Sequence, residues 1–193
     1  MSHYTREEVI EKIHAGKSLA GEDLSGIDLS YETLKGADFT KANLSDAHLQ
    51  NSNLEGAHFN NANLTSAFLF GCNLHKAVLD GAILDEANLQ DSNLDAASLK
   101  KARMHHVALL GSSLEKADLT EADLTRGRLK RANLRGAKLD RALLDQAHLE
   151  RADLSKASFV HADLRNASLT NVIVRETNFN GAKLDGAIGL AEE

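Results

Sequence analysis

The chain of 193 residues contains no tryptophan and no proline, and aromatic residues make up only 4% of it. A globular core of this size normally uses more large aromatic side chains. The core is therefore expected to be narrow and filled by small, regularly spaced side chains. A single cysteine excludes a disulfide framework within the chain.

Two further absences limit the compartment and the partners. No apolar run reaches the length of a membrane span, and residues 1–18 lack the apolar stretch of a signal peptide. A net charge of −6 argues against non-specific nucleic-acid binding, which needs a basic surface. The sequence predicts a soluble, cytoplasmic protein that contacts neither a membrane nor nucleic acid directly.

What the chain does contain is a period of five residues. Every fifth position from Leu19 to Leu184 holds Leu or Phe over 34 consecutive positions, which we call central positions. Met104 and Val174 are the two exceptions. From Ala37 to Ala182, the residue two positions before each central position is mostly Ala, and otherwise Ser, Cys, Gly, Val or Thr. A period of five fits neither an α-helix nor a β-strand. It indicates a chain that turns one corner per five residues, with the large and the small residue pointing inward.

The repeated unit, as in Ala37-Asp38-Phe39 or Ala152-Asp153-Leu154, resembles the pentapeptide-repeat protein family over residues 19–184. The resemblance implies an all-β fold, a right-handed quadrilateral β-helix of about eight coils with four pentapeptides in each. Residues 1–18 are predicted to form a helical cap, residues 19–185 the β-helix and residues 186–193 a C-terminal tail.

The sequence supports a coil of twenty residues in two ways. The Phe residues at central positions all differ by multiples of twenty, so they fall on one face: Phe39, Phe59, Phe159 and Phe179. A column of Asn residues precedes the central position of a second face: Asn53, Asn73, Asn93 and Asn133. Stacked amide side chains can hydrogen-bond from one coil to the next.

The two ends of the predicted solenoid differ. Thr5 and Glu8 have the spacing of a capping box, which predicts a short helix that covers the first coil. No comparable helix follows the last repeat, so the last coil is expected to stay partly open. In this family an uncovered end often becomes a two-fold dimer interface, and Phe179, Ile188 and Leu190 are the candidate residues for a homodimer.

Outward-facing apolar residues are few. Phe68, Phe70 and Leu110 share one face by the count of twenty, and they form the candidate partner-binding site. Val78 and Ile83 stand on other faces. The plain alternative is that all five are scattered surface residues, which soluble proteins commonly carry.

No residue pattern indicates catalysis or a bound cofactor. Cys72 occupies a small inward position and is expected to be a buried, unreactive thiol. The histidines of the repeats all fall at outward positions on several faces, whereas a metal site needs ligands that converge. The sequence contains no catalytic triad spacing, phosphate-binding glycine loop or metal motif. We therefore predict no enzyme activity, no catalytic residues, no metal and no cofactor.

Charge is distributed unevenly. Residues 1–100 carry 15 acidic and 7 basic side chains, and residues 101–193 carry 13 acidic and 15 basic ones. Many of the acids adjoin a central residue, where Asp and Asn favour turns. A cluster of cations interrupts the acidic surface: Arg126, Arg128, Lys130, Arg131, Arg135, Lys138 and Arg141. One expectation is that they pair with Asp140, Asp145 and Glu150 on adjacent coils.

The leading functional prediction is a rigid, non-catalytic scaffold whose flat faces bind a protein partner. The alternative comes from the family resemblance. Some members mimic B-form DNA, bind DNA gyrase and protect it from quinolones or toxins. The acidic balance agrees with this alternative. The cation cluster, and the lack of the projecting loops that some gyrase-protecting members carry between coils, argue against it.

Overall fold

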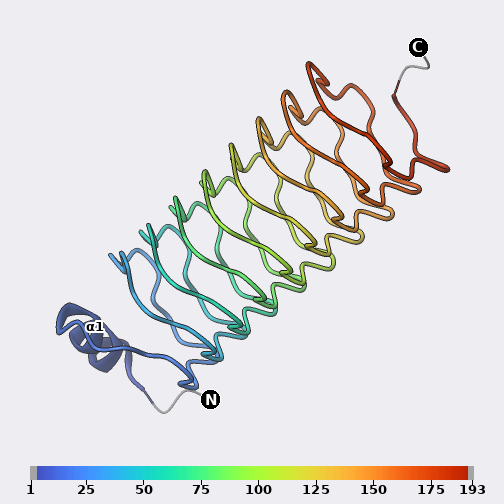
Figure 1. The fold of residues 1–193 in the computed structure, drawn as a ribbon. Helices are drawn as coiled ribbons and strands as arrows, with labels where there is room; N and C mark the ends of the chain where they lie inside the picture. Colours follow the sequence, from blue (N-terminus) through green and yellow to red (C-terminus); the bar gives the residue numbers. More distant parts are fainter. Residues whose placement is uncertain (1–3, 191–193) are drawn as a thin grey trace.

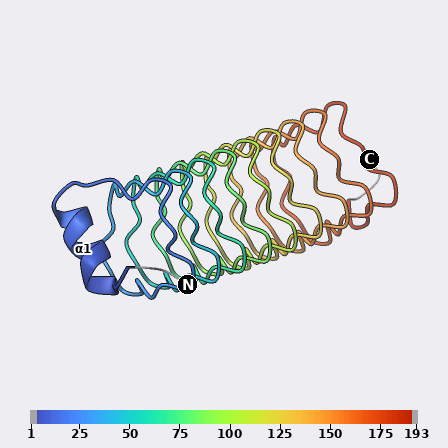
Figure 2. The same cartoon turned by 90° about the horizontal axis from the view of Figure 1, so that it is seen from below.

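In the computed structural model, which describes residues 4–190, one helix is followed by a long stack of coils (Figure 1). The helix α1 (Arg6–His14) lies across one end of the stack, and the C-terminus lies at the other (Figure 2). Within residues 4–190 the coils contact one another through isolated parallel β-bridges rather than longer strands. Each bridge joins residues twenty positions apart, from Asp23–Asn43 to Ser168–Ile188, so the predicted register of twenty is confirmed.

Backbone hydrogen bonds connect every coil to its neighbours. Asn43 shows the repeating pattern, since its N–H donates to the carbonyl of Glu22 at 2.9 Å and its carbonyl accepts from the N–H of Leu24 at 2.7 Å. Within each pentapeptide a turn is closed by a bond such as Ala47 N–H to the Leu44 carbonyl, at 3.1 Å. The polar backbone is thereby satisfied along the rod, as a buried main chain requires.

Each corner contains one residue in the left-handed conformation, two positions after the central residue. Glycine fills some of these corners, such as Gly81 with φ of 66°, but Lys76 and Ala96 adopt the same conformation with φ of 57°. For a non-glycine residue the left-handed conformation is about 1–2 kcal/mol less stable than the right-handed one. The hydrogen bonds of the adjoining coils impose the conformation, because the corner N–H, as at Lys76, donates to the next coil.

The interior of the stack is closed and apolar. Leu84, Leu124 and Leu144 are completely buried, as are most of the small residues two positions before them. The rings of Phe39 and Phe59 stack at 5.1 Å between centroids, and a second pair, Phe159 and Phe179, stacks at 5.2 Å. The stacking of these residues on one face is the arrangement that their spacing predicts.

Polar residues at the small inward position bond to the preceding coil. The hydroxyl of Ser92 donates to the Leu69 carbonyl at 2.7 Å, and the thiol of Cys72 donates to the Leu49 carbonyl at 2.8 Å. Burial raises the pKa of the Cys72 thiol, which keeps the group protonated and unreactive. The prediction of a buried thiol at Cys72 is confirmed.

Asp and Asn residues before the central position organise the turns. Asp118 is typical, because its carboxylate accepts from the backbone N–H of Thr120, two residues later, at 3.1 Å. Ser98 stands where other repeats have the acid. There the carboxylate of Asp80, on the preceding coil, accepts hydrogen bonds from the Ser98 hydroxyl at 2.6 Å and from the Lys100 N–H at 3.0 Å. An acid on either of two adjacent coils can therefore serve one turn.

Amide side chains also bond between coils. The amide of Asn73 donates to that of Asn53 at 3.2 Å, as the column of Asn residues predicts. A second series, which the sequence analysis did not identify, runs from Asn63 through Asn43 to Asp23, with bonds of 3.2 and 3.0 Å. These bonds are partly buried and add side-chain contacts to the backbone ladder.

Helix α1 closes the N-terminal end as its sequence predicts. Thr5 and Glu8 form the reciprocal capping box, and Val9 is fully buried against the first coil. Arg6 fastens the helix to the rod, because its guanidinium lies 2.5 Å from the carboxylate of Glu32 and donates to the Ser30 carbonyl at 2.9 Å. The apolar cross-section at this end is therefore covered.

The corner geometry yields a stability prediction. Ala96→Gly should stabilise the protein by about 0.5–1 kcal/mol, because glycine adopts the left-handed corner without a steric penalty. The adjacent Ala97→Gly is the matched control, and it should destabilise by about 1 kcal/mol since Ala97 fills the interior. Urea unfolding followed by circular dichroism measures both. If both variants changed the free energy of unfolding by the same amount in the same direction, the assignment of Ala96 to the corner would be contradicted.

The inward and outward positions yield a second prediction. Phe59 is fully buried, whereas Phe68 and Phe70 are each 39% exposed. Phe59→Ser should destabilise the fold by more than about 3 kcal/mol. The double variant Phe68→Ser, Phe70→Ser should lose less than about 1 kcal/mol per residue. Thermal unfolding of the two variants compares them directly, and an unfolded double variant would refute the outward placement.

Candidate functional site

The face that carries Phe68 and Phe70 consists of the outward residues on either side of the central residues of one column. We call it the Phe68 face. The two sets of side chains form parallel ridges that run along the rod, one on each side of the buried central leucines. One ridge contains His48, Phe68, Asn88, Ala108, Arg128 and His148, and the other contains Gln50, Phe70, Gln90, Leu110, Lys130 and Glu150.

The candidate contact residues lie on this face at two levels. Phe68 and Phe70 belong to one coil, and the ring of His48 on the preceding coil stacks against Phe68 at 4.7 Å. Leu110 is half-buried and lies two coils further along, in the ridge of Phe70, with Gln90 between them. The residues therefore share a face, as predicted, but they do not form one continuous apolar patch. Their contact with a partner stays a prediction.

The C-terminal end exposes a second group of apolar residues. The predicted interface residues Phe179 and Leu190 are half-buried, and Ile188 is 61% exposed. Ile173 and Val174, which were not among the predicted interface residues, are 43% and 42% exposed. In the sequence, the replacement of the usual central Leu by Val174 could have indicated that the coil differs here. Within residues 4–190 no element covers this end as α1 covers the other (Figure 2).

Cations gather on one coil at residues 126–131. Arg126 and Arg131 stand at two corners of the Phe68 face, and Arg128 and Lys130 stand on the face between them. Within residues 4–190 the side chains of Arg128, Lys130 and Arg131 have neither an ion pair nor a hydrogen bond. Arg126 bonds only to the neutral side chain of Gln146, at 3.3 Å.

The expected pairing of the cation cluster with Asp140, Asp145 and Glu150 is wrong, and the one member that pairs across coils in the described part of the chain, Arg135, does so with Asp153 at 3.3 Å. Asp140 instead accepts from Ser158 and from the backbone N–H of Val160. Asp145 accepts from Asn166 at 2.9 Å and from Gln146 at 2.8 Å, and these bonds lower the pKa of its carboxyl group. Glu150 interacts with His148 at 3.4 Å. Asp140 and Asp145 are thus occupied by turn and ladder contacts, whereas Oε2 of Glu150 is buried without a hydrogen-bond partner among the described residues. Within residues 4–190 the side chains of Arg128, Lys130 and Arg131 stay unpaired.

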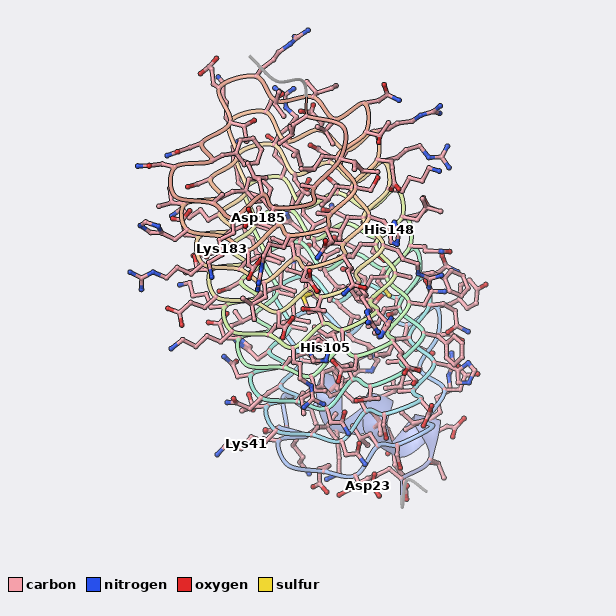
Figure 3. The ribbon with its side chains drawn as sticks, turned by 90° about the vertical axis from the view of Figure 1, so that its right-hand side faces the viewer. Asp23, Lys41, His105, His148, Lys183 and Asp185 are labelled. Carbon is pink, nitrogen blue, oxygen red and sulfur yellow. The ribbon has the colours of Figure 1, made fainter. Side chains whose placement is uncertain are left out.

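Two pairs of charged or titratable side chains meet on the face next to the Phe68 face. His105 lies 2.8 Å from Asp123, and Arg103 lies 2.7 Å from Asp85, on the face next to the Phe68 face. In Figure 3 His148, which belongs to the Phe68 face, stands to the side of Lys183 and Asp185 of that neighbouring face. Burial raises the pKa of Asp123, but the hydrogen bonds from Thr125 and His105 lower it overall.

Residues 4–190 contain neither a cluster of potential metal ligands nor a membrane-spanning helix. No group of three or more His, Cys, Asp or Glu side chains converges there as metal ligands do. No helix in that range has the length and apolar character needed to cross a bilayer.

Comparisons with known proteins agree with this architecture. The sequence profile of the family described as "Pentapeptide repeats" matches the chain in eight copies. The matched stretches, from 18–56 to 162–188, together run from residue 18 to residue 188. No curated protein matches the chain significantly by sequence.

Solved structures give the same result. HetL, a pentapeptide repeat protein involved in heterocyst differentiation regulation in the cyanobacterium Nostoc, is 30% identical over 97% of this chain and 98% of its own, with a TM-score of 0.52. A pentapeptide repeat protein of the cyanobacterium Cyanothece is 33% identical over 48% of this chain and 63% of its own, with a TM-score of 0.47.

The plasmid-mediated fluoroquinolone resistance protein QnrB1 is a more distant match. It is 19% identical over 83% of this chain and 88% of its own, with a TM-score of 0.44. The repeat profile and the likeness to HetL both extend over nearly the whole chain. On these grounds the chain belongs to the pentapeptide-repeat protein family and folds as a β-helix solenoid with one helix.

Proposed function

We propose that the rod is a non-catalytic scaffold that binds a protein partner through the Phe68 face. The observation that carries this proposal is the exposure of Phe68 and Phe70, 39% each, on a flat face of a rigid coil. Aromatic side chains are enriched where protein surfaces meet, because they bury a large area with little loss of conformational freedom. In this proposal the rod is right-handed and has about eight coils, as the family resemblance implies.

The closed interior supports a function on the outside. Leu and Ala side chains line the interior of the coils and are almost completely buried between Leu44 and Leu169, so the accessible surface of these coils is their outer side. The backbone of each coil is bonded to its neighbours, which holds the outward side chains at fixed positions. Because the surface is already ordered, binding a partner costs little free energy for immobilising its side chains.

The alternative proposal, a DNA mimic that binds gyrase, has weaker support. The surplus of acids in residues 1–100 favours it. Several of those acids are turn acceptors, such as Asp28 and Asp38, and they serve the fold regardless of any partner. The unpaired cations at Arg128, Lys130 and Arg131 also break the negative surface that a mimic of duplex DNA requires.

The scaffold proposal is tested by affinity capture from native lysate with the double variant Phe68→Ser, Phe70→Ser. Proteins that bind the Phe68 face should be retained by the wild type and lost by this variant. The matched control is Val78→Ser, Ile83→Ser, which removes two outward apolar residues from other faces. A partner lost equally from both variants would argue against the Phe68 face. Gyrase subunits retained by both would support the alternative.

We also propose that the C-terminal end joins two copies in a homodimer. Phe179, Ile188 and Leu190 form an apolar surface there, and within residues 4–190 no further coil packs against it. A second copy placed end to end covers the apolar surface and pairs the two last coils edge to edge. The exposed apolar residues are the support for this arrangement.

Light scattering tests the dimer. The wild type is expected to have twice the mass of one chain, and Ile188→Asp should convert it to a monomer, because a buried charge opposes association. Leu143→Asp serves as the control, since Leu143 is also exposed, at 44%, but lies on the side of the rod. A wild-type monomer at high concentration would exclude this interface.

A further inference from the structure

A shallow groove of about 340 Å³ lies on the Phe68 face, beyond the two exposed phenylalanines. Its walls are the two ridges of that face. Gln90, Leu110, Lys130 and Glu150 form one wall, and Arg128 and His148 form the other.

The groove combines an apolar residue with cations that have no partner. Leu110 is half-buried at its N-terminal part, and the exposed side chains of Arg128 and Lys130 follow one coil later. Neither cation has an ion pair or a hydrogen bond within residues 4–190. Arg126 and Arg131 add two positive charges at the corners that flank the groove. The one carboxylate in its wall, Glu150, lies beside His148.

We propose that this groove binds an acidic protein segment that carries an apolar side chain. The inference rests on the scaffold function and specifies the chemistry of its partner. Carboxylates pair with guanidinium groups through two parallel hydrogen bonds, which Arg128 is free to donate. Leu110 receives the apolar side chain one coil away, at roughly 4.8 Å along the rod. The ridge of Leu110 continues through Gln90 to Phe70, so a longer segment also reaches the aromatic pair.

The charges favour an acidic protein segment over nucleic acid. The four cations belong to a single coil of a chain whose net charge is −6. A duplex gains its affinity from many phosphate contacts along an extended basic surface, which the rest of this rod does not provide. The groove wall contains no Phe, Tyr or Trp, and a single ring, His148, offers little of the stacking surface that successive bases of a single strand use.

Fluorescence anisotropy with a defined probe tests the proposal. The probe is a labelled decapeptide of eight Glu and two Leu residues, with a second peptide in which Ser replaces Leu and a third in which Gln replaces Glu. The wild-type protein should bind the first peptide at least fivefold more tightly than either of the others. Arg128→Glu, Lys130→Glu should weaken that binding at least tenfold, and Leu110→Ser should weaken it about fivefold.

The matched control is Arg141→Glu, Lys156→Glu, which reverses two unpaired cations that flank the opposite face. It should change the affinity less than twofold. Equal loss in the two double variants, or no preference for the Leu-containing peptide, would overturn the proposal. A single-stranded or duplex DNA of equal charge that binds more tightly than the peptide would also overturn it.

The result separates this inference from the scaffold function itself. Failure of the peptide to bind, together with a partner that depends on Phe68 and Phe70, refutes the acidic groove and leaves the scaffold intact. Binding of the peptide without any captured partner of the phenylalanines supports the groove and argues against Phe68 and Phe70 as the contact site.

Discussion

The whole structure depends on the chain returning to the same place after every twenty residues. The return brings each backbone N–H and C=O within reach of its counterpart on the next coil, so that hydrogen bonds and the apolar interior form together. Neither is stable alone, because a single coil cannot bury its leucines and an unpaired edge leaves polar groups exposed. The left-handed corner is accepted at residues such as Lys76 because this register demands it.

Because the interior is closed and apolar, the accessible surface of the rod consists of its outer faces and its ends. Each pentapeptide contributes a buried central residue, a small inward residue and three outward positions whose identity the fold constrains little. Some outward residues nevertheless serve the turns, as Asp118 does for Thr120. Residues without a turn or ladder partner are more informative, and Phe68, Phe70, Arg128 and Lys130 are of this kind. They stand on one face, which is the physical basis for assigning the partner to it.

The cation cluster illustrates how local chemistry and tertiary contacts interact. Opposite charges on adjacent coils suggest neutralisation, yet Asp140 and Asp145 form hydrogen bonds with uncharged groups at short range. A carboxylate that already accepts from backbone or amide donors has little to gain from a flexible, solvated cation. Arg135, which lies 3.3 Å from Asp153, is the member of the cluster that does form an ion pair. The unpaired members therefore remain available to an external carboxylate.

The sequence by itself determined the period of five, the coil of twenty and the capping box at Thr5 and Glu8, because each depends on residues at fixed spacing. The spacing of Phe39 and Phe59 was sufficient to predict their stacking. The tertiary structure alone decided which charges are neutralised, which amide ladders form and how far the last coil is exposed. These outcomes depend on distances between side chains of different coils. Where a side chain has several possible partners, its actual partner is known only once the positions of all of them are known.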